Sequence, residues 1–220
     1  MTESSSKSAA DSPKDLATLL QLPVRYWKQS LAGVLVVVAA AGGYALYGVY
    51  QKSQVEKTEN ALGAIVTAKT GADRLTALEA LAKSAPAAAR DGIWLEMAKT
   101  ASELGKFDKA AEAWHSVSTS APAAMKAVAG LGYASSLAKA GQNAKAVEVL
   151  ENLGVSVPKP FSMTVDRQLA TTAEAAGEWQ KALSAFERMK ADGHVQNAAY
   201  LDARITALKA KIAAGAKADG

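Results

Sequence analysis

Two histidines, His115 and His194, are the first residues to consider for catalysis or metal binding, because imidazole can serve both roles near neutral pH. Neither has a convincing carboxylate or thiolate partner at metal-ligand spacing, and the chain contains no cysteine. Glu96, Glu103 and Glu112 are typical of solvated helix faces rather than of an acid–base pair. Neither a Gly-rich phosphate loop nor a Gly-x-Ser-x-Gly elbow occurs. The sequence therefore predicts no catalytic residue, metal, cofactor or small-molecule substrate.

The charged residues are spread along the chain. The 25 basic and 21 acidic residues give a net charge of +4 without the dense Lys/Arg blocks that bind phosphate backbones. Half of the residues are hydrophobic, but only 6% are aromatic, and the excess is mainly alanine, which favours closely packed helices. We therefore predict an all-α protein that does not bind nucleic acid.

A period of 36 residues runs through the chain after residue 77. Four columns of identical residues keep this period, and a fifth always holds a large apolar residue. The columns are Pro86, Pro122 and Pro158; Ala98, Ala134 and Ala170; Gly105, Gly141 and Gly177; Ala110, Ala146 and Ala182; and Leu78, Trp114, Leu150 and Phe186. Alanine lets two helices cross closely, glycine ends a helix in the left-handed conformation, and proline stops the next helix. The period predicts a stack of helix hairpins.

The unit from Asp91 to Pro122 resembles a tetratricopeptide repeat. Its matching residues are Trp94, Met97, Ala98, Gly105, Phe107, Ala110, Trp114 and Pro122. Val55–Ser84 is predicted to be a degenerate first unit, with Lys69 where the pattern has glycine. An amphipathic capping helix is predicted over Val195–Ala214, from the spacing of Ala198, Leu201, Ile205, Leu208 and Ile212. The resemblance implies a solenoid of about four hairpins plus this capping helix.

In such a solenoid the first helix of each hairpin lines a concave surface. By the repeat register, the predicted partner-binding residues are Leu95, Lys99, Ser102, Glu103, Leu131, Ser135, Lys139, Arg167, Thr171 and Glu174. The basic residues among them are too scattered for the dense Lys/Asn set with which some repeat proteins clamp a terminal carboxylate. An ordinary hydrophilic groove without a dedicated ligand is the alternative interpretation.

The only long run without a charge is Leu31–Tyr50, which at about 1.5 Å per residue is long enough for a helix to cross a hydrocarbon core of about 30 Å. We predict a disordered or interfacial tail over residues 1–30, a transmembrane helix over 31–50, a repeat domain over 51–214 and a disordered end over 215–220. The residues after Tyr50 lack proline and glycine up to Gly63, so the membrane helix can continue into the repeats.

Two questions about this span stay open from the sequence. Basic residues are equally frequent on its two sides, so the short tail only weakly favours a domain outside the cytoplasm. Ala39–Ala41 could also be a signal-peptide cleavage site, although the apolar run continues for nine more residues. The small residues Ala39, Gly42 and Gly43 either let a partner helix approach or are simply tolerated in lipid.

Tail, span and repeats together resemble the YfgM family of bacterial inner-membrane proteins, which are ancillary subunits of the Sec translocon. The resemblance lies in layout and repeat pattern. It implies a periplasmic domain that works with the SecYEG translocon and a PpiD-like membrane-anchored chaperone, receiving emerging polypeptides. The alternatives are a membrane-anchored scaffold for envelope assembly or cell division, and a cytoplasm-facing adaptor with reversed topology.

Overall fold

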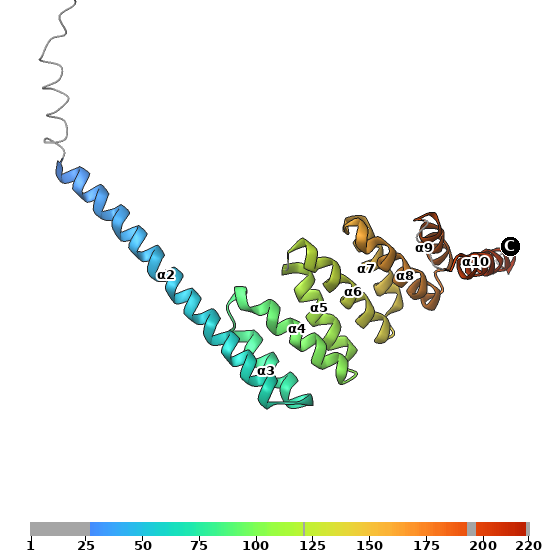
Figure 1. Cartoon of the computed structure of the whole chain (residues 1–220), viewed down its shortest axis with the longest axis horizontal. Coiled ribbons are helices and arrows are strands. Elements are labelled where there is room, and N and C mark those ends of the chain that lie inside the picture. Colours follow the sequence, from blue (N-terminus) through green and yellow to red (C-terminus); the bar gives the residue numbers. More distant parts are fainter. Residues whose placement is uncertain (1–26, 121, 193–196, 219–220) are drawn as a thin grey trace, which may run out of the picture. The chain divides into compact units, whose positions relative to one another are not determined.

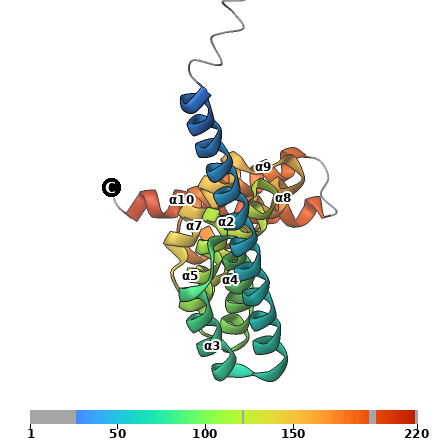
Figure 2. The ribbon, with the colours of Figure 1, turned by 90° about the vertical axis from the view of Figure 1, so that its left-hand side faces the viewer.

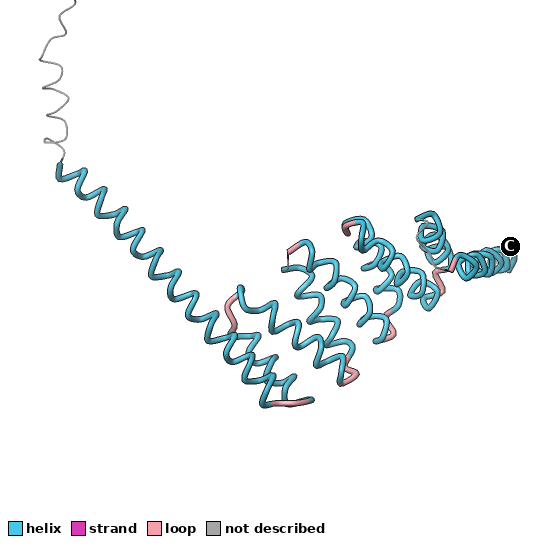
Figure 3. The backbone as a smooth tube through the Cα atoms, in the orientation of Figure 1, coloured by secondary structure: helices cyan, strands magenta, loops and turns pink. Residues whose placement is uncertain are grey.

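The computed structural model describes residues 27–120, 122–192 and 197–218, which form α-helices joined by short turns, without a β-strand (Figures 1 and 3). The predicted all-α class is therefore confirmed. The predicted tail up to residue 26, His194 and residues 219–220 lie outside the described residues. The chain divides into two compact units, Met1–Ser53 and Gln54–Gly220.

The first unit contains most of helix α2, which runs from Trp27 to Ala68. It begins four residues before the predicted span. Residues 33–50 are all exposed, with Val36 at 68% and Leu46 at 73% of full exposure. By length and composition, Gly33–Ala68 can cross a membrane. A long apolar helical surface that is exposed in this way is the kind of surface that a bilayer or a partner covers.

The second unit is a row of antiparallel helices, visible in two directions in Figures 1 and 2. In each hairpin of this row, a first helix is followed after a short turn by a second helix. Consecutive helices pack against each other. After the end of α2 come α3 (Gly71–Ser84), α4 (Ala87–Glu103), α5 (Phe107–Ser120), α6 (Ala123–Lys139), α7 (Asn143–Ser156), α8 (Lys159–Ala176), α9 (Trp179–Asp192) and α10 (Ala198–Ala218). The end of α2 acts as the first helix of the degenerate unit, because Leu62 and Ile65 pack against the cluster around Leu78.

The turn residues behave as their types predict. Gly105, Gly141 and Gly177 follow first helices and have φ angles of 68°, 80° and 76°, in the left-handed region that glycine adopts without strain. In the degenerate unit the left-handed residue is Gly71, two positions after Lys69, with φ of 55°. The turn has shifted to the nearest glycine.

The alanine columns form the contacts inside the hairpins. Ala98, Ala134 and Ala170 on first helices are completely buried, as are their second-helix counterparts. Those counterparts are Ala110, Ala146 and Ala182. Because an alanine side chain is a single methyl group, two helix backbones can approach closely at these points. Large side chains, such as Leu150 and Phe186, then fill the space between neighbouring hairpins.

Helix α10 takes the place of the first helix of a further hairpin. Its buried residues Leu201, Ile205 and Leu208 lie 36 positions after Val165, Leu169 and Thr172 of α8, which are also buried. The predicted capping helix is thus confirmed from Ala198 onward, while Val195, where the prediction began, lies outside the described residues. It ends at Ala218, four residues beyond the predicted domain end, because its last turns are rich in alanine.

The side of α10 that corresponds, in the repeat register, to the buried alanine side of α8 is polar. In register with the buried Ala170 and Ala173 of α8, α10 carries Thr206 and Lys209. Lys209 forms an ion pair of 3.0 Å with Glu187 of α9. Asp202, on the same side of α10, forms one of 2.5 Å with Lys190. This end of the stack is therefore closed by charged groups that pair back onto α9.

Two glycines inside α6 allow close packing by larger neighbours. A Cβ atom added at Gly132 would lie 2.6 Å from two ring atoms of Trp114 on α5, and one added at Gly130 would lie 2.9 Å from Leu153 on α7. The Trp114 ring is rigid and half-buried, so it cannot move aside as easily as the end of a leucine side chain. Gly132 is therefore required by packing.

We expect Gly132→Ala to lower the free energy of unfolding by about 1–2 kcal/mol, because an overpacking cost of about 1–3 kcal/mol exceeds the usual gain from replacing glycine within a helix. Gly63→Ala is the matched control, since nothing lies within 4 Å of the added Cβ there, and it should stabilise the protein by about 0.5–1 kcal/mol. Urea unfolding followed by circular dichroism measures both. A gain in stability from both variants would contradict this account of Gly132.

Candidate protein-binding surface

The structure brings together three of the ten residues predicted to bind a partner. Ser135 and Lys139 of α6 and Thr171 of α8 line one groove of about 380 Å³ between these two first helices. Helices α6 and α8 contact each other directly, and the Gln168 side-chain amide of α8 donates a hydrogen bond of 3.2 Å to the Leu131 carbonyl of α6. The name inner groove is used below for this site, whose remaining lining residues are Ala138, Asn143, Gln168, Thr172 and Ala175.

The inner groove is polar but almost uncharged. Its only ionic side chain is Lys139, whose ammonium group lies 5.5 Å from the centre of the Phe107 ring, and whose charge is therefore already engaged by an aromatic face. The other polar groups are hydroxyls and amides. The Thr171 hydroxyl already donates within its own helix, to the Gln168 carbonyl at 3.0 Å or the Arg167 carbonyl at 3.2 Å, so its oxygen is left as an acceptor. Within the part of the chain that the structure describes, the Asn143 side chain makes no hydrogen bond. These groups can bind a polar, uncharged ligand.

The repeat register explains why space exists beside Asn143. At the interface between hairpins before the inner groove, the Lys139 ammonium lies 5.5 Å from the centre of the Phe107 ring. At the interface after the inner groove, the Lys211 ammonium lies 4.3 Å from the centre of the Trp179 ring. Both pairs occupy the same two repeat positions, 72 residues apart. At the interface between these two, which contains the inner groove, the same positions hold Asn143 and Ala175. A short amide and a methyl group therefore replace an aromatic ring and a lysine.

The two predicted apolar contacts, Leu95 and Leu131, are half-buried between hairpins. Leu95 packs against the cluster of Val117 and Ala129, and Leu131 packs against the large C-terminal core. Much of their apolar surface is therefore used within the protein, and the part that a partner could contact is small.

Glu174 is paired within the protein. Its carboxylate forms an ion pair with Arg204 of α10, and its side chain is only 17% exposed. Glu174 therefore ties α10 to α8. Ser102 donates a hydrogen bond of 2.7 Å to the Ala98 carbonyl of its own helix.

The last three predicted residues, Lys99, Glu103 and Arg167, are exposed. None of their side chains has a polar partner among the described residues. They are accessible to a partner without loss of an internal contact, but they do not line the inner groove.

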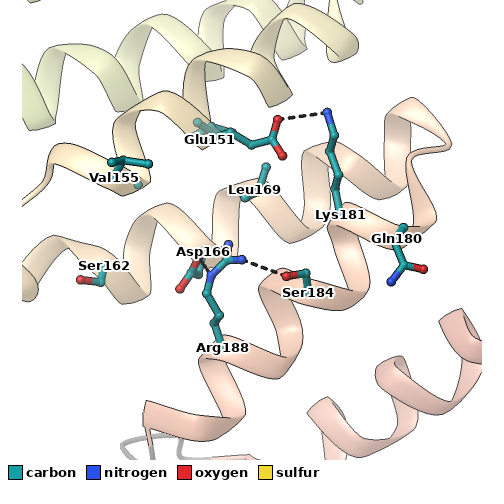
Figure 4. Close-up of a pocket in the computed structure, with 11 residues that line it drawn as sticks. Glu151, Val155, Ser162, Asp166, Leu169, Gln180, Lys181, Ser184 and Arg188 are labelled. Carbon is teal, nitrogen blue, oxygen red and sulfur yellow. Dashed lines mark hydrogen bonds and ion pairs between the residues drawn. The ribbon is translucent and has the colours of Figure 1, made fainter.

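A larger cavity of about 640 Å³ lies among α7, α8 and α9 (Figure 4). Small residues at its lining, such as Gly154, Ser162 and Ser184, leave the space open. Its charged residues pair with one another, Lys181 with Glu151 at 3.0 Å and Arg188 with Asp166 at 2.6 Å.

Lys181 also binds Glu178, at 2.7 Å, and the hydrogen bonds to Glu178 and then Glu151 raise the pKa of this lysine. Every charged residue that lines the cavity forms an ion pair with a neighbour. We therefore infer that these residues hold the last hairpins together.

His115 is exposed, and its ring contacts that of Tyr133 at a tilt of 42°, with ring centres 4.9 Å apart. The residues that the structure describes contain no group of three or more metal-binding side chains. His115 therefore makes a packing contact at the surface between α5 and α6.

Five lining residues of the inner groove were not predicted from the sequence, and Asn143 and Gln168 are the two amides among them. Asn143 lies at the start of a second helix, outside the predicted face, and Gln168 is directed toward the preceding hairpin. The available signal was the column of Phe107, Asn143 and Trp179, in which a single amide interrupts two aromatic residues.

Comparison with known proteins supports the repeat interpretation. The sequence profile described as a tetratricopeptide repeat-like domain matches residues 24–210. Two solved structures from Podospora anserina, of the nearly identical TPR-like repeats of a protein described as a kinesin light chain and of a single-substitution variant of those repeats, are similar to this chain. Each shares 19% identity and covers 73% of this chain and 95% of its own, with a TM-score of 0.46. No curated protein gave a significant sequence match.

Proposed function

Because the chain belongs to the tetratricopeptide repeat-like domain family, whose fold serves protein–protein interaction, we propose that it is a membrane-anchored binding module rather than an enzyme. The observation that carries this proposal is the inner groove, where exposed Lys139 and Thr171 come together with Ser135 from two consecutive first helices. The exposed apolar helix of the first unit supports the membrane anchor.

In its specific form, the proposal is an ancillary subunit of the Sec translocon in the bacterial inner membrane. The repeat domain would lie in the periplasm and bind SecYEG, a PpiD-like chaperone or emerging polypeptides. Support comes from the layout, in which the one candidate span among the described residues precedes a tetratricopeptide-like domain. The work would be reversible binding, without nucleotide hydrolysis. Protease accessibility of the repeat domain in spheroplasts tests its periplasmic placement.

Photo-crosslinking in living cells tests the binding role. A photoreactive residue at Lys139 or Thr171, in the inner groove, is expected to form adducts with translocon subunits or nascent chains, because both side chains are exposed there. Glu148 on the second helix α7 is the matched control, since it is also exposed but does not line the groove. Mass spectrometry of adducts purified in mild detergent identifies the partners.

Adducts confined to cell-wall synthesis enzymes would replace the translocon role by that of an envelope scaffold. Equal adducts from Glu148 and from the groove positions would show that the inner groove is not the binding surface.

A further inference from the structure

We propose that the repeat domain binds the surface of the bilayer through one edge, on which the turns between hairpins lie. The name turn edge is used for the exposed residues there, which are Lys83, Met125, Lys126, Val128, Val155 and Lys159. This inference rests on the proposed membrane anchor. It goes beyond that anchor by stating that the domain itself contacts the headgroups of anionic phospholipids.

The turns between hairpins share one edge because the helices of the second unit alternate in direction. The turns from α3 to α4, from α5 to α6 and from α7 to α8 lie along this edge, and the turns inside the hairpins lie along the other (Figure 1). The end of α2 acts as a first helix, with Leu62 packed beside Ile93 of α4. Gln54, at which the second unit begins, therefore lies on the same edge as the start of α4.

The covalent chain keeps this edge near the end of the apolar run. That run ends at Tyr50, and Gln54 follows four residues later. Four residues span at most about 14 Å even when fully extended, and this limit holds for every orientation of the second unit. An anchor that ends at Tyr50 therefore holds the Gln54 end of the repeat domain close to the headgroups.

Exposed apolar side chains of the second unit gather on the same edge. Among its described residues, five large apolar side chains are exposed, and of these only Leu104 lies at a turn inside a hairpin. The other four lie at the ends of helices that meet the turns between hairpins, and they are Met125, Val128, Val155 and Tyr200. Val155, in the last turn of α7, keeps 91% of its surface exposed. Apolar side chains exposed in this way gain burial when they enter the boundary between headgroups and acyl chains.

The basic residues of the turn edge have no internal partner. Lys83, Lys126 and Lys159 are exposed, and none of their side chains forms an ion pair or a hydrogen bond among the described residues. The nearby Asp91 carboxylate already accepts a hydrogen bond from Ser120. Free ammonium groups beside exposed apolar side chains match a surface of anionic headgroups over hydrocarbon.

The opposite edge lacks this combination. Most of its lysines are engaged within the protein, by a carboxylate, an amide or an aromatic ring. These lysines are Lys109, Lys139, Lys145 and Lys181. The free cations and the exposed apolar side chains therefore coincide on the edge that the anchor holds near the bilayer. Because they come from separate turns in a row, they suit an extended surface better than a compact partner.

Lipid contact is tested with the full chain in liposomes. The chain contains no cysteine, so single-cysteine variants carry one fluorescent label each. The liposomes contain about 30% anionic phospholipid and a small share of phospholipid with a nitroxide quencher on its headgroup. Labels at Val128→Cys and Val155→Cys should lose at least about half of their fluorescence, whereas a label at Leu104→Cys should lose less than about one tenth.

A charge change separates binding from mere proximity. The test variant converts the three free lysines of the turn edge, by Lys83→Gln, Lys126→Gln and Lys159→Gln. With the label at position 155, this variant should show at least about twofold less quenching, as should wild-type charges in about 0.5 M NaCl. The matched control removes three other exposed lysines, by Lys69→Gln, Lys99→Gln and Lys106→Gln, and should quench as before. Circular dichroism verifies that both variants fold.

Equal quenching at positions 104 and 155, or no quenching at 155 in liposomes that carry the chain, would overturn the inference and leave the anchor intact. Quenching that is unchanged in the test variant, or in purely zwitterionic liposomes, would also overturn it, because the tether alone would then explain the proximity. A chain that does not float with the liposomes in a density gradient would reject the anchor itself and this inference with it.

Discussion

Replacing Phe186 with alanine is expected to lower the free energy of unfolding of the repeat domain by about 3–5 kcal/mol, the range for removing a buried phenylalanine. Phe186 is 2% exposed and belongs to the large C-terminal core. Its ring makes an edge-to-face contact with Tyr200 of α10, with centres 6.4 Å apart. Loss of the ring therefore leaves a cavity between α9 and its neighbours and weakens the attachment of α10.

Phe161→Ala is the matched control, because Phe161 lies near the start of α8 and is only half-buried. It should cost about 1 kcal/mol, in proportion to the smaller area removed from contact. Denaturant unfolding of both variants, followed by circular dichroism, gives the comparison. Similar losses for the two variants would mean that Phe186 does not hold the last hairpins together.

Deletion of α10, residues 198–220, is expected to have the largest effect on stability. The deletion removes the buried Leu201, Ile205 and Leu208 and exposes the side of α9 that carries Phe186 and Met189. At about 1.5–3 kcal/mol for each buried side chain, the three lost residues alone remove about 5–9 kcal/mol of favourable burial, before the entropy gained by omitting the helix. We expect the α8–α9 hairpin to lose stable structure.

Hydrogen exchange measured along the full chain and the shortened chain gives the result residue by residue. Amide exchange in α8 and α9 should rise at least about tenfold, while α4 and α5 stay near their original rates, because each hairpin of a solenoid contacts mainly its neighbours. Deleting only residues 213–220 is the control, since Leu208 and the buried residues before it remain. Unchanged exchange in α9 after loss of α10 would refute the capping role.

The repeat pattern predicted most of the fold because it depends on the few positions where size or conformation is decisive. Gly105 must be able to adopt a positive φ, and Ala98 must be small enough for two helices to cross. Such requirements are visible in a single sequence whenever they recur at a fixed period.

The candidate site was only partly predictable, because a repeat register gives a face of a helix but not what lies opposite it. Glu174 was placed on the correct helix, yet Arg204 of α10 uses its carboxylate. Leu95 was placed on the binding face, yet the neighbouring hairpin covers part of it. Asn143 escaped the prediction because it lies outside that face, and its importance appears only when the contacts at the two flanking interfaces are known.

The charged side of α10 also limits how copies of this chain can associate. A helix docking there, as the second helix of another repeat would, must take Lys209 and Asp202 out of water together with their partners Glu187 and Lys190, or break these ion pairs. Burying charges whose partners have been removed costs several kcal/mol. Head-to-tail association of copies through this side of α10 is therefore disfavoured.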